Sequence, residues 1–176
     1  SVFANERLWL NDEWSIVGGV RWGAYEVDQN TTTFNSTAVC NGAPAVPAPG
    51  VPAAIRDCGK AGIPFAIVLT AGFREAGPEG RKLEAELARA AKDSGVRFIG
   101  PNCQGSLSVP SRMWCVFGSV SHETELKEGA VSCAFQSGGF GYAVVNLAEA
   151  QGVGFRHVVS TGNETDVTMP ELLSEF

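Results

Sequence analysis

Four consecutive residues, Gln136-Ser137-Gly138-Gly139, could bind an anion. They follow a short apolar run at 130–135 and precede apolar residues at helical spacing, which predicts a strand-turn-helix unit. Glycines let the backbone approach a ligand closely, and Ser137 can cap the helix. Because free N–H groups at a helix start carry partial positive charge, the sequence predicts a phosphate or carboxylate site at Ser137, Gly138 and Gly139. The alternative is a tight glycine turn without a ligand.

The cysteines are spread along the chain without C-x-x-C spacing: Cys40, Cys58, Cys103, Cys115 and Cys133. An odd number without such spacing favours reduced thiols over a disulfide framework, and it predicts no metal site. Cys103 could act as a nucleophile. No histidine and carboxylate stand in a recognisable arrangement with it, so a small buried thiol is favoured.

The two histidines and one acidic pair have ordinary structural explanations. His122 lies in a polar segment and His157 inside an apolar run, which favours a solvated residue and a packed core residue over general bases. Glu164 and Asp166 could be paired acids, or residues of a loop and helix start that the helix dipole favours. The sequence therefore predicts no catalytic residue in this chain.

The composition of the 176 residues, 44% hydrophobic and 18% charged, is that of an ordinary globular protein. The net charge of -6 and the lack of a basic stripe argue against nucleic acid as the main partner. No apolar run approaches the roughly 18 residues of a membrane span, and no signal-peptide pattern begins the sequence. We expect a cytoplasmic protein with neither nucleic-acid nor membrane partners.

Short apolar runs alternate with helical patterns from residue 51 onward, which is typical of an α/β fold. The predicted strands are 65–69, 96–99, 130–135 and 155–160, and the predicted helices are 51–61, 78–94, 140–151 and 170–176. Such units are right-handed and form a parallel sheet covered on both faces. Ligands bind at the carboxyl ends of the strands, which selects loops 47–49, 70–73, 100–105 and 136–139. Residues 106–129 are turn-rich and predict a linker.

Residue spacing also describes two helices and assigns faces to the first of them. In 78–94 the inner stripe is predicted to be Leu83, Leu87, Ala90 and Ala91, and the charged residues, Glu84 among them, are predicted to face water. In the helix that follows Gly139, the apolar residues at helical spacing are Phe140, Ala143, Val144, Leu147 and Ala148. Further upstream, Gly18 and Gly19 follow a possible strand and could open a nucleotide-binding unit, although a plain glycine turn is the alternative.

Five short motifs stand in one order along residues 44–176: Val46-Pro-Ala-Pro49, Ala71-Gly-Phe73, Gly100-Pro-Asn-Cys103, Gln136-Ser-Gly138 and Ser160-Thr-Gly-Asn163. Their order and spacing resemble those of the nucleoside-diphosphate-forming acyl-CoA ligases. That superfamily includes the succinyl-CoA synthetase alpha subunit and the ADP-forming acetyl-CoA synthetases.

The resemblance implies a truncated Rossmann-like CoA-binding domain in residues 1–110, a linker in 111–128 and the start of a flavodoxin-like parallel-sheet domain in 129–176. The residues implied to bind CoA are Gly18, Gly19, Pro47 and Ala48. Those implied to line the active site are Asn102, Cys103, Gln136 and Asn163, and Ser137, Gly138 and Gly139 would hold the phosphate of a phosphohistidine.

The activity that the resemblance implies is part of an acyl-CoA ligase, which joins a carboxylic acid to CoA with nucleotide hydrolysis through acyl phosphate and phosphohistidine. The family's histidine motif and the ATP-grasp part that takes ATP with Mg²⁺ are not in this sequence. An ATP-grasp domain or subunit and an oligomer are therefore expected partners. The alternative is a non-catalytic, CoA-responsive or scaffolding module; an oxidoreductase is disfavoured because the dinucleotide fingerprint is missing.

Overall fold

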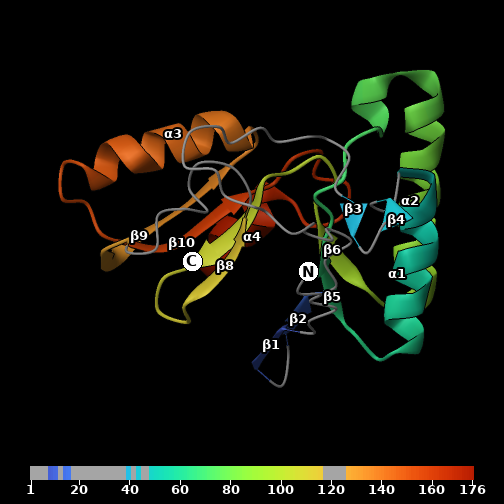
Figure 1. The fold of residues 1–176 in the computed structure, drawn as a ribbon, viewed down its shortest axis with the longest axis horizontal. Helices are drawn as coiled ribbons and strands as arrows, with labels where there is room; N and C mark the ends of the chain where they lie inside the picture. Colours follow the sequence, from blue (N-terminus) through green and yellow to red (C-terminus); the bar gives the residue numbers. More distant parts are fainter. Residues whose placement is uncertain (1–7, 12–13, 17–38, 41–42, 45–47, 117–125) are drawn as a thin grey trace.

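The computed structural model describes residues 8–11, 14–16, 39–40, 43–44, 48–116 and 126–176, and Figure 1 shows their arrangement. Two short antiparallel pairs come first, β1 (Leu8–Asn11) with β2 (Trp14–Ile16) and β3 (Val39–Cys40) with β4 (Ala43–Pro44). The elements that follow are η1 (Ala48–Gly50), α1 (Val51–Lys60), β5 (Phe65–Ile67), η2 (Arg74–Ala76), α2 (Pro78–Ser94), β6 (Arg97–Ile99), β7 (Gly105–Ser108), β8 (Met113–Val116), β9 (Glu128–Phe135), α3 (Gly138–Glu149), β10 (Phe155–Ser160) and α4 (Met169–Glu175).

The first α/β unit consists of the parallel strands β5 and β6 with α1 and α2 packed beside them. Pro78 fixes the first turn of α2, and Gly95 ends the helix in the left-handed region at φ 68°. Leu87, Phe73 and Phe98 are fully buried between the helices and the strands. The predicted helix 78–94 is confirmed to the residue.

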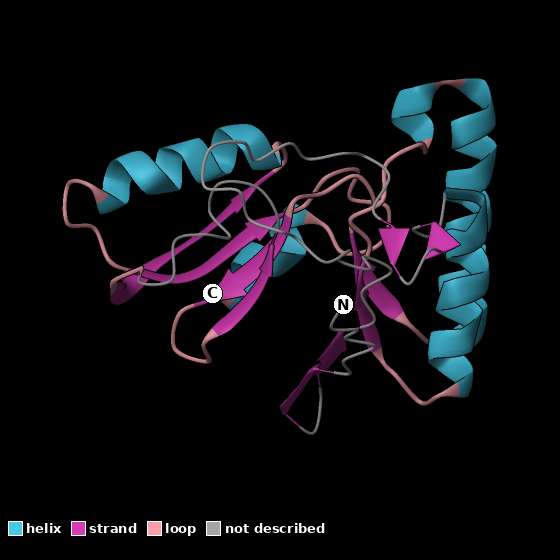
Figure 2. Ribbon diagram, in the orientation of Figure 1, coloured by secondary structure: helices cyan, strands magenta, loops and turns pink. Residues whose placement is uncertain are grey.

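The second unit is a four-stranded sheet in the order β8-β7-β10-β9, in which β9 and β10 are parallel. Helix α3 covers one face and buries Val145 against Leu107 and Val158. The other face meets the first unit, where Val159 packs with Ile67 and the neighbouring buried residues. Figure 2 shows α3 and the α1–α2 pair on opposite sides of the strands. The predicted α/β fold is confirmed.

A β-hairpin occupies part of the segment that the sequence predicted to be a turn-rich linker. Strands β7 and β8 are antiparallel, and β7 pairs with β10 from Ser108↔His157 to Gly105↔Ser160. The short stretch Gly-Ser-Leu-Ser has little local strand signal, because what stabilises it is a partner strand about fifty residues later in the chain. The domain boundaries inferred from the family resemblance stay a prediction.

Helix α3 does not bury the apolar residues that recur at helical spacing in its sequence. Tyr142 and Val145 are buried, whereas Phe140, Val144 and Leu147 are 68%, 38% and 71% exposed. This helix is apolar on most of its circumference, so spacing alone could not select the inner face. The close approach of the helix backbone to Phe135 of β9 at Gly141 selects it.

The part of the chain that the structure describes contains no helix long and apolar enough to cross a membrane.

Two glycines of α3 should respond oppositely to replacement by alanine. A Cβ on Gly141 would lie 2.4 Å from Cγ of Phe135, whereas a Cβ on Gly139 has no atom within 4 Å. We predict that Gly141→Ala lowers the free energy of unfolding by about 1–3 kcal/mol through overpacking. Gly139→Ala should raise it by up to about 1 kcal/mol, because alanine favours the helix. Urea denaturation checks both, and equal effects of the two changes would contradict the packing described.

Candidate functional site

The loops that follow β5, β6, β9 and β10 meet at one edge of the structure. The N–H of Asn102 donates to the carbonyl of Thr70 at 2.9 Å, and the N–H of Asn163 donates to the carbonyl of Pro101 at 2.8 Å. Each parallel pair, β5 with β6 and β9 with β10, places its two loops side by side at the carboxyl ends of its strands, and these hydrogen bonds join the two pairs. Four segments distant in sequence thus form one polar cluster.

Gly162 makes the close approach between two of these loops possible. Its φ is +60°, and a Cβ there would lie 2.3 Å from the carbonyl oxygen of Pro101 and 2.6 Å from that of Asn102. Gly162 also exchanges hydrogen bonds with Gln136: its N–H donates to the Gln136 carbonyl at 3.2 Å, and Gln136 Nε2 donates to the Gly162 carbonyl at 3.1 Å. The predicted site residues Asn102 and Gln136 therefore both contact the loop that carries Asn163.

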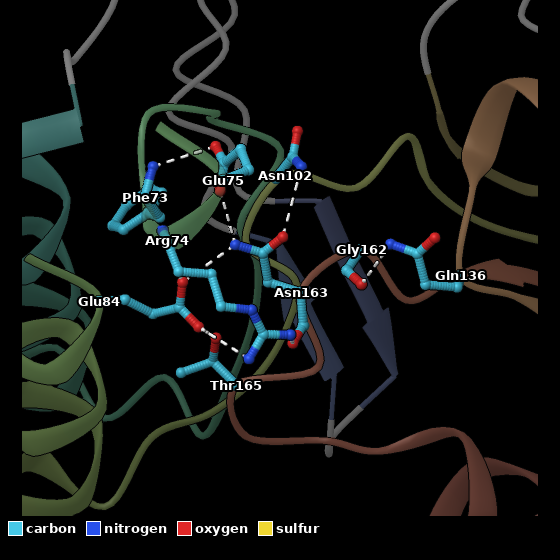
Figure 3. Close-up of polar contacts among 9 residues, drawn as sticks. All are labelled: Phe73, Arg74, Glu75, Glu84, Asn102, Gln136, Gly162, Asn163 and Thr165. Carbon is cyan, nitrogen blue, oxygen red and sulfur yellow. Dashed lines mark hydrogen bonds and ion pairs between the residues drawn. The ribbon is translucent and has the colours of Figure 1, made fainter. Parts of the chain in front are cut away.

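Asn163 lies at the centre of the cluster and is 4% exposed. Its Nδ2 donates to Glu75 Oε2 at 2.7 Å and to Glu84 Oε2 at 2.9 Å, and its Oδ1 accepts from Asn102 Nδ2 at 3.3 Å (Figure 3). The guanidinium of Arg74 donates to its backbone carbonyl. The side-chain amide of Asn163 therefore bonds to protein partners through both its nitrogen and its oxygen, and these bonds fix the position of the loop after β10.

Glu84 is buried, contrary to the prediction that it faces water; it is 6% exposed. Besides Asn163, its carboxylate accepts from Thr165 Oγ1 at 2.5 Å and from the N–H of Arg74 at 2.9 Å. The Arg74 guanidinium lies 3.4 Å from it as an ion pair. Paired and hydrogen-bonded in this way, a charged side chain can stay inside a protein.

Helical register explains why Glu84 is inside. Gly80, Glu84, Leu87 and Ala91 lie on the same face of α2, and all four are buried. Gly80 allows that face to approach the loop after β5, because a Cβ there would lie 1.7 Å from the Phe73 carbonyl oxygen. The register could have revealed this residue from the sequence, but its charge assigned it to solvent.

Glu75 sits at the exposed rim of the cluster. Its Oε1 accepts from the backbone N–H groups of Gly72 at 2.6 Å and Phe73 at 3.0 Å, and its Oε2 accepts from Asn163. Desolvation acts to raise the pKa of this carboxyl group, but the hydrogen bonds from Asn163, Gly72 and Phe73 outweigh it and hold the pKa below the ordinary value. Glu75 is therefore a bound carboxylate at neutral pH, and sequence reasoning did not select it.

Cys103 lies behind the cluster in the core, where it is 4% exposed and packs with Ile99 and Val159. Its Sγ donates to the Val68 carbonyl at 3.4 Å. Burial raises the pKa of this thiol to about 12. A protonated, enclosed thiol is a poor nucleophile, which fits the buried-thiol explanation better than covalent catalysis.

The N-terminus of α3 opens beside the cluster. Ser137 is the N-cap, and its Oγ accepts from the N–H of Phe140 at 3.5 Å, so the predicted capping role is confirmed. The N–H groups of Gly138 and Gly139, in the first turn, lie beyond the reach of intrahelical bonds. Gly139 is exposed, and a Cβ built on it would have no atom within 4 Å. Its backbone N–H is therefore accessible to an external anion.

Gly138 faces inward at the same helix start. A Cβ there would lie 2.2 Å from Cβ of Gln104 and 2.9 Å from Oγ of Ser160. The Ser160 hydroxyl also accepts from the N–H of Gln104 at 3.1 Å. The first turn of α3 is thus pressed against the loop after β6, which brings the predicted anion site next to the loop that carries Asn102.

The remaining predicted site residues divide into two groups. Gly18, Gly19 and Pro47 lie outside the described residues, as does His122. Ala48, in η1, lies beside the loop after β5, since a Cβ on Gly72 would be 3.1 Å from Ala48 Cβ.

His157 is only partly buried, and its ring stacks on Phe176 with centroids 6.0 Å apart. Burial, and to a smaller extent the positive charge of the neighbouring Arg156, lowers the pKa of His157. The neutral imidazole is thereby favoured. Among the described residues no group of three or more His, Cys, Asp or Glu side chains could hold a metal ion.

Comparison with known proteins gives the chain its family. Residues 128–176 match the model of the succinyl-CoA ligase like flavodoxin domain. ADP-forming acetate–CoA ligase I of Archaeoglobus fulgidus is 43% identical over 119 residues, which are 68% of this chain and 17% of that protein. The alpha subunit of ADP-forming acetate–CoA ligase I of Pyrococcus furiosus is 34% identical over 131 residues, 74% of this chain and 28% of that subunit.

The chain belongs to the nucleoside-diphosphate-forming acyl-CoA ligase superfamily. The apo acetyl-coenzyme A synthetase 1 of Ca. Korarchaeum cryptofilum superposes with a TM-score of 0.67 at 38% identity, over 74% of this chain and 27% of that one. A protein of Pyrococcus horikoshii OT3 gives a TM-score of 0.67 at 31% identity, over 86% of this chain and 33% of that one. This chain therefore spans about a third or less of the length of the relatives it matches.

The lowered pKa of Glu75 makes a pH-dependent contribution to stability. A carboxyl group with a depressed pKa in the folded state stabilises the fold above its ordinary value of 4.5 and loses that contribution as pH falls through the folded pKa. We predict that Glu75→Gln is less stable than the natural chain at pH 7 and that the difference shrinks below pH of about 4.5. Urea denaturation of both proteins across that range measures it. A constant difference would contradict the bound carboxylate.

Proposed function

We propose that this chain is part of an acyl-CoA ligase that joins a carboxylic acid to CoA with nucleotide hydrolysis. The observation that carries the proposal is the convergence of four loops on Asn163, next to the free N-terminus of α3, in a chain 43% identical to an ADP-forming acetate–CoA ligase. In this proposal the reaction proceeds through acyl phosphate and a phosphohistidine that other segments of the ligase supply.

For CoA, we propose that Gly18, Gly19, Pro47 and Ala48 bind the nucleotide and its thiol arm. Support comes from the place of Ala48, which lies against Gly72 in the loop after β5. An arm passing Ala48 is thereby directed toward the loop cluster. Asn102, Cys103, Gln136 and Asn163 would line the site where the thioester forms, with Cys103 and Asn163 acting from buried positions.

For phosphate, we propose the first turn of α3. The N–H groups of Gly138 and Gly139 carry the positive end of the helix dipole, and Ser137 holds the turn in place. Fixed backbone donors stabilise charge on a transferring phosphoryl group without reorganising, a role worth about 3–4 kcal/mol per donor in other enzymes. This is the chemistry that the described residues can contribute to phosphoryl transfer.

The remaining steps require partners. We propose that an ATP-grasp domain or subunit binds ATP and Mg²⁺. Two relatives are themselves named alpha subunits, and one solved relative was determined in complex with phosphate and ADP. An oligomer of such parts in the cytoplasm is the assembly that we propose for this ligase.

The CoA site is testable by calorimetric titration of CoA into this chain. The natural chain should bind CoA saturably, near one per chain, and Ala48→Trp should weaken binding by about tenfold or more because the indole fills the space beside Gly72. Ala53→Trp, at an exposed position of α1, is the matched control and should bind normally. Lack of binding at millimolar CoA would overturn the proposal and favour a scaffolding module.

The phosphate site is testable at Gly139, where a side chain has room. We predict that Gly139→Asp weakens binding of inorganic phosphate by about tenfold or more, because like charges about 4 Å apart repel by roughly 1–4 kcal/mol. Gly139→Asn has the same shape without the charge and should retain most of the affinity. Phosphorus NMR titration measures the three proteins, and equal affinities in the Asp and Asn variants would rule out an anion at this helix start.

A further inference from the structure

The side-chain amide of Asn163 is held in one orientation. A carboxylate only accepts hydrogen bonds, so the Nδ2 group of Asn163 must face Glu75 and Glu84, at 2.7 Å and 2.9 Å. Its Oδ1 is thereby turned toward Asn102, which donates through Nδ2 at 3.3 Å. Rotating the amide by half a turn would set its oxygen against two carboxylates and Nδ2 against Nδ2.

This orientation is passed on to Asn102. Because its Nδ2 points to Asn163, its own Oδ1 points away from Asn163, as Figure 3 shows. Its backbone is fixed as well, at φ 56°, a conformation that asparagine adopts more readily than most residues, with its N–H on Thr70. Asn102 is half-buried, so this oxygen is a hydrogen-bond acceptor of defined direction at the rim of the cluster.

Gln136, in the turn between β9 and α3, repeats the pattern on the other side of the loop after β10. Its Nε2 donates to the Gly162 carbonyl at 3.1 Å, and its side-chain oxygen points away from that loop (Figure 3). Two amides therefore turn acceptor oxygens outward, beside a helix start that offers N–H donors to anions. A carboxylate oxygen is repelled by such acceptors, whereas an S–H or N–H group is attracted.

We propose that Glu84 is a positioning residue that, through Asn163, fixes Asn102 as the hydrogen-bond acceptor for the thiol of CoA. The proposal rests on the proposed function, which supplies CoA as the ligand. Asn102 selects the thiol over a carboxylate at this position because it presents only its oxygen.

Glu84 holds this role rather than Glu75 because of burial. Glu84 is 6% exposed and fixes Asn163, Thr165 and the Arg74 backbone at once, so water does not replace it. Glu75 is exposed, and water can substitute for its contact to Asn163. Glu84→Gln keeps the shape of the side chain but places an NH₂ group among donors, which removes the constraint on the Asn163 amide.

The chain of hydrogen bonds from Glu84 through Asn163 to Asn102, called the relay below, is tested in the free protein by NMR of the side-chain amide groups. The variants Asn102→Asp and Asn163→Asp assign the amide signals. Glu84→Gln should shift the signals of both Asn163 and Asn102. Glu79→Gln makes the same charge change at an exposed position of α2 and should shift neither. A spectrum in which the Asn102 signals stay unchanged in Glu84→Gln would overturn the relay, whatever the chain binds.

Recognition of the thiol is tested by calorimetry with CoA and with desulfo-CoA, which lacks the thiol. The natural chain should prefer CoA by about threefold, the size of a weak hydrogen bond, and Glu84→Gln should bring this ratio toward one. General structural damage would instead weaken both ligands equally and leave the ratio intact, which would overturn the positioning role. Asn102→Gly, suited to the positive φ, removes the acceptor without changing Glu84 and should abolish the preference as well.

The outcomes separate this inference from the proposed function. Equal affinity of the natural chain for CoA and desulfo-CoA would overturn recognition of the thiol and leave CoA binding in place. Failure of the natural chain to bind either ligand would overturn the proposed function together with thiol recognition, and the NMR shifts would still decide whether Glu84 orients Asn102.

Discussion

The buried hydrogen bond between the carboxylate of Glu84 and the amide of Asn163 joins residues 79 positions apart and ties the two α/β units together at the candidate site. Both groups are nearly excluded from water, so breaking their contact leaves a buried polar group unpaired at a cost of about 1–3 kcal/mol. Arg74 and Thr165 use the remaining capacity of the carboxylate. Helix α2 therefore holds the loop after β10 from inside, in addition to the backbone hydrogen bonds that join this loop to the loop after β6.

The sheet β8-β7-β10-β9 explains why that position is useful. In its strand β10, Val158 packs against α3 and Val159 packs against the first unit. Helix α3 and the first unit therefore lie against the same strand. The loop that leaves β10 then passes the loops of the first unit on one side and the start of α3 on the other. Gly162 and Gly138 allow these contacts, since neither has room for a side chain.

The resulting edge offers hydrogen-bonding groups of opposite polarity side by side. The first turn of α3 presents N–H donors, which suit phosphate, while Asn102 and Gln136 present oxygen acceptors, which suit a thiol or amide. A ligase that passes an acyl group from phosphate to sulfur needs both kinds of group within one site. The donors follow from the direction of a helix. The acceptors follow from the two carboxylates that orient Asn163 and from the Gly162 carbonyl that orients Gln136.

Local patterns sufficed for much of this protein. Pro78 and Gly95 determined the bounds of α2, Ser137 marked the cap of α3, and the order of the glycine-containing motifs indicated the ligase family and the loops that meet. The pairing of Gly105–Ser108 with β10, the inner face of α3 and the hydrogen-bond partners that hold Glu84 inside were decided by tertiary structure. Two of these depend on partners far away in the chain, namely strand β10 and the amide of Asn163. The inner face of α3 depends on the packing of Gly141 against the ring of Phe135. Propensity and periodicity describe neighbours along the chain, so contacts of this kind lie beyond what they encode.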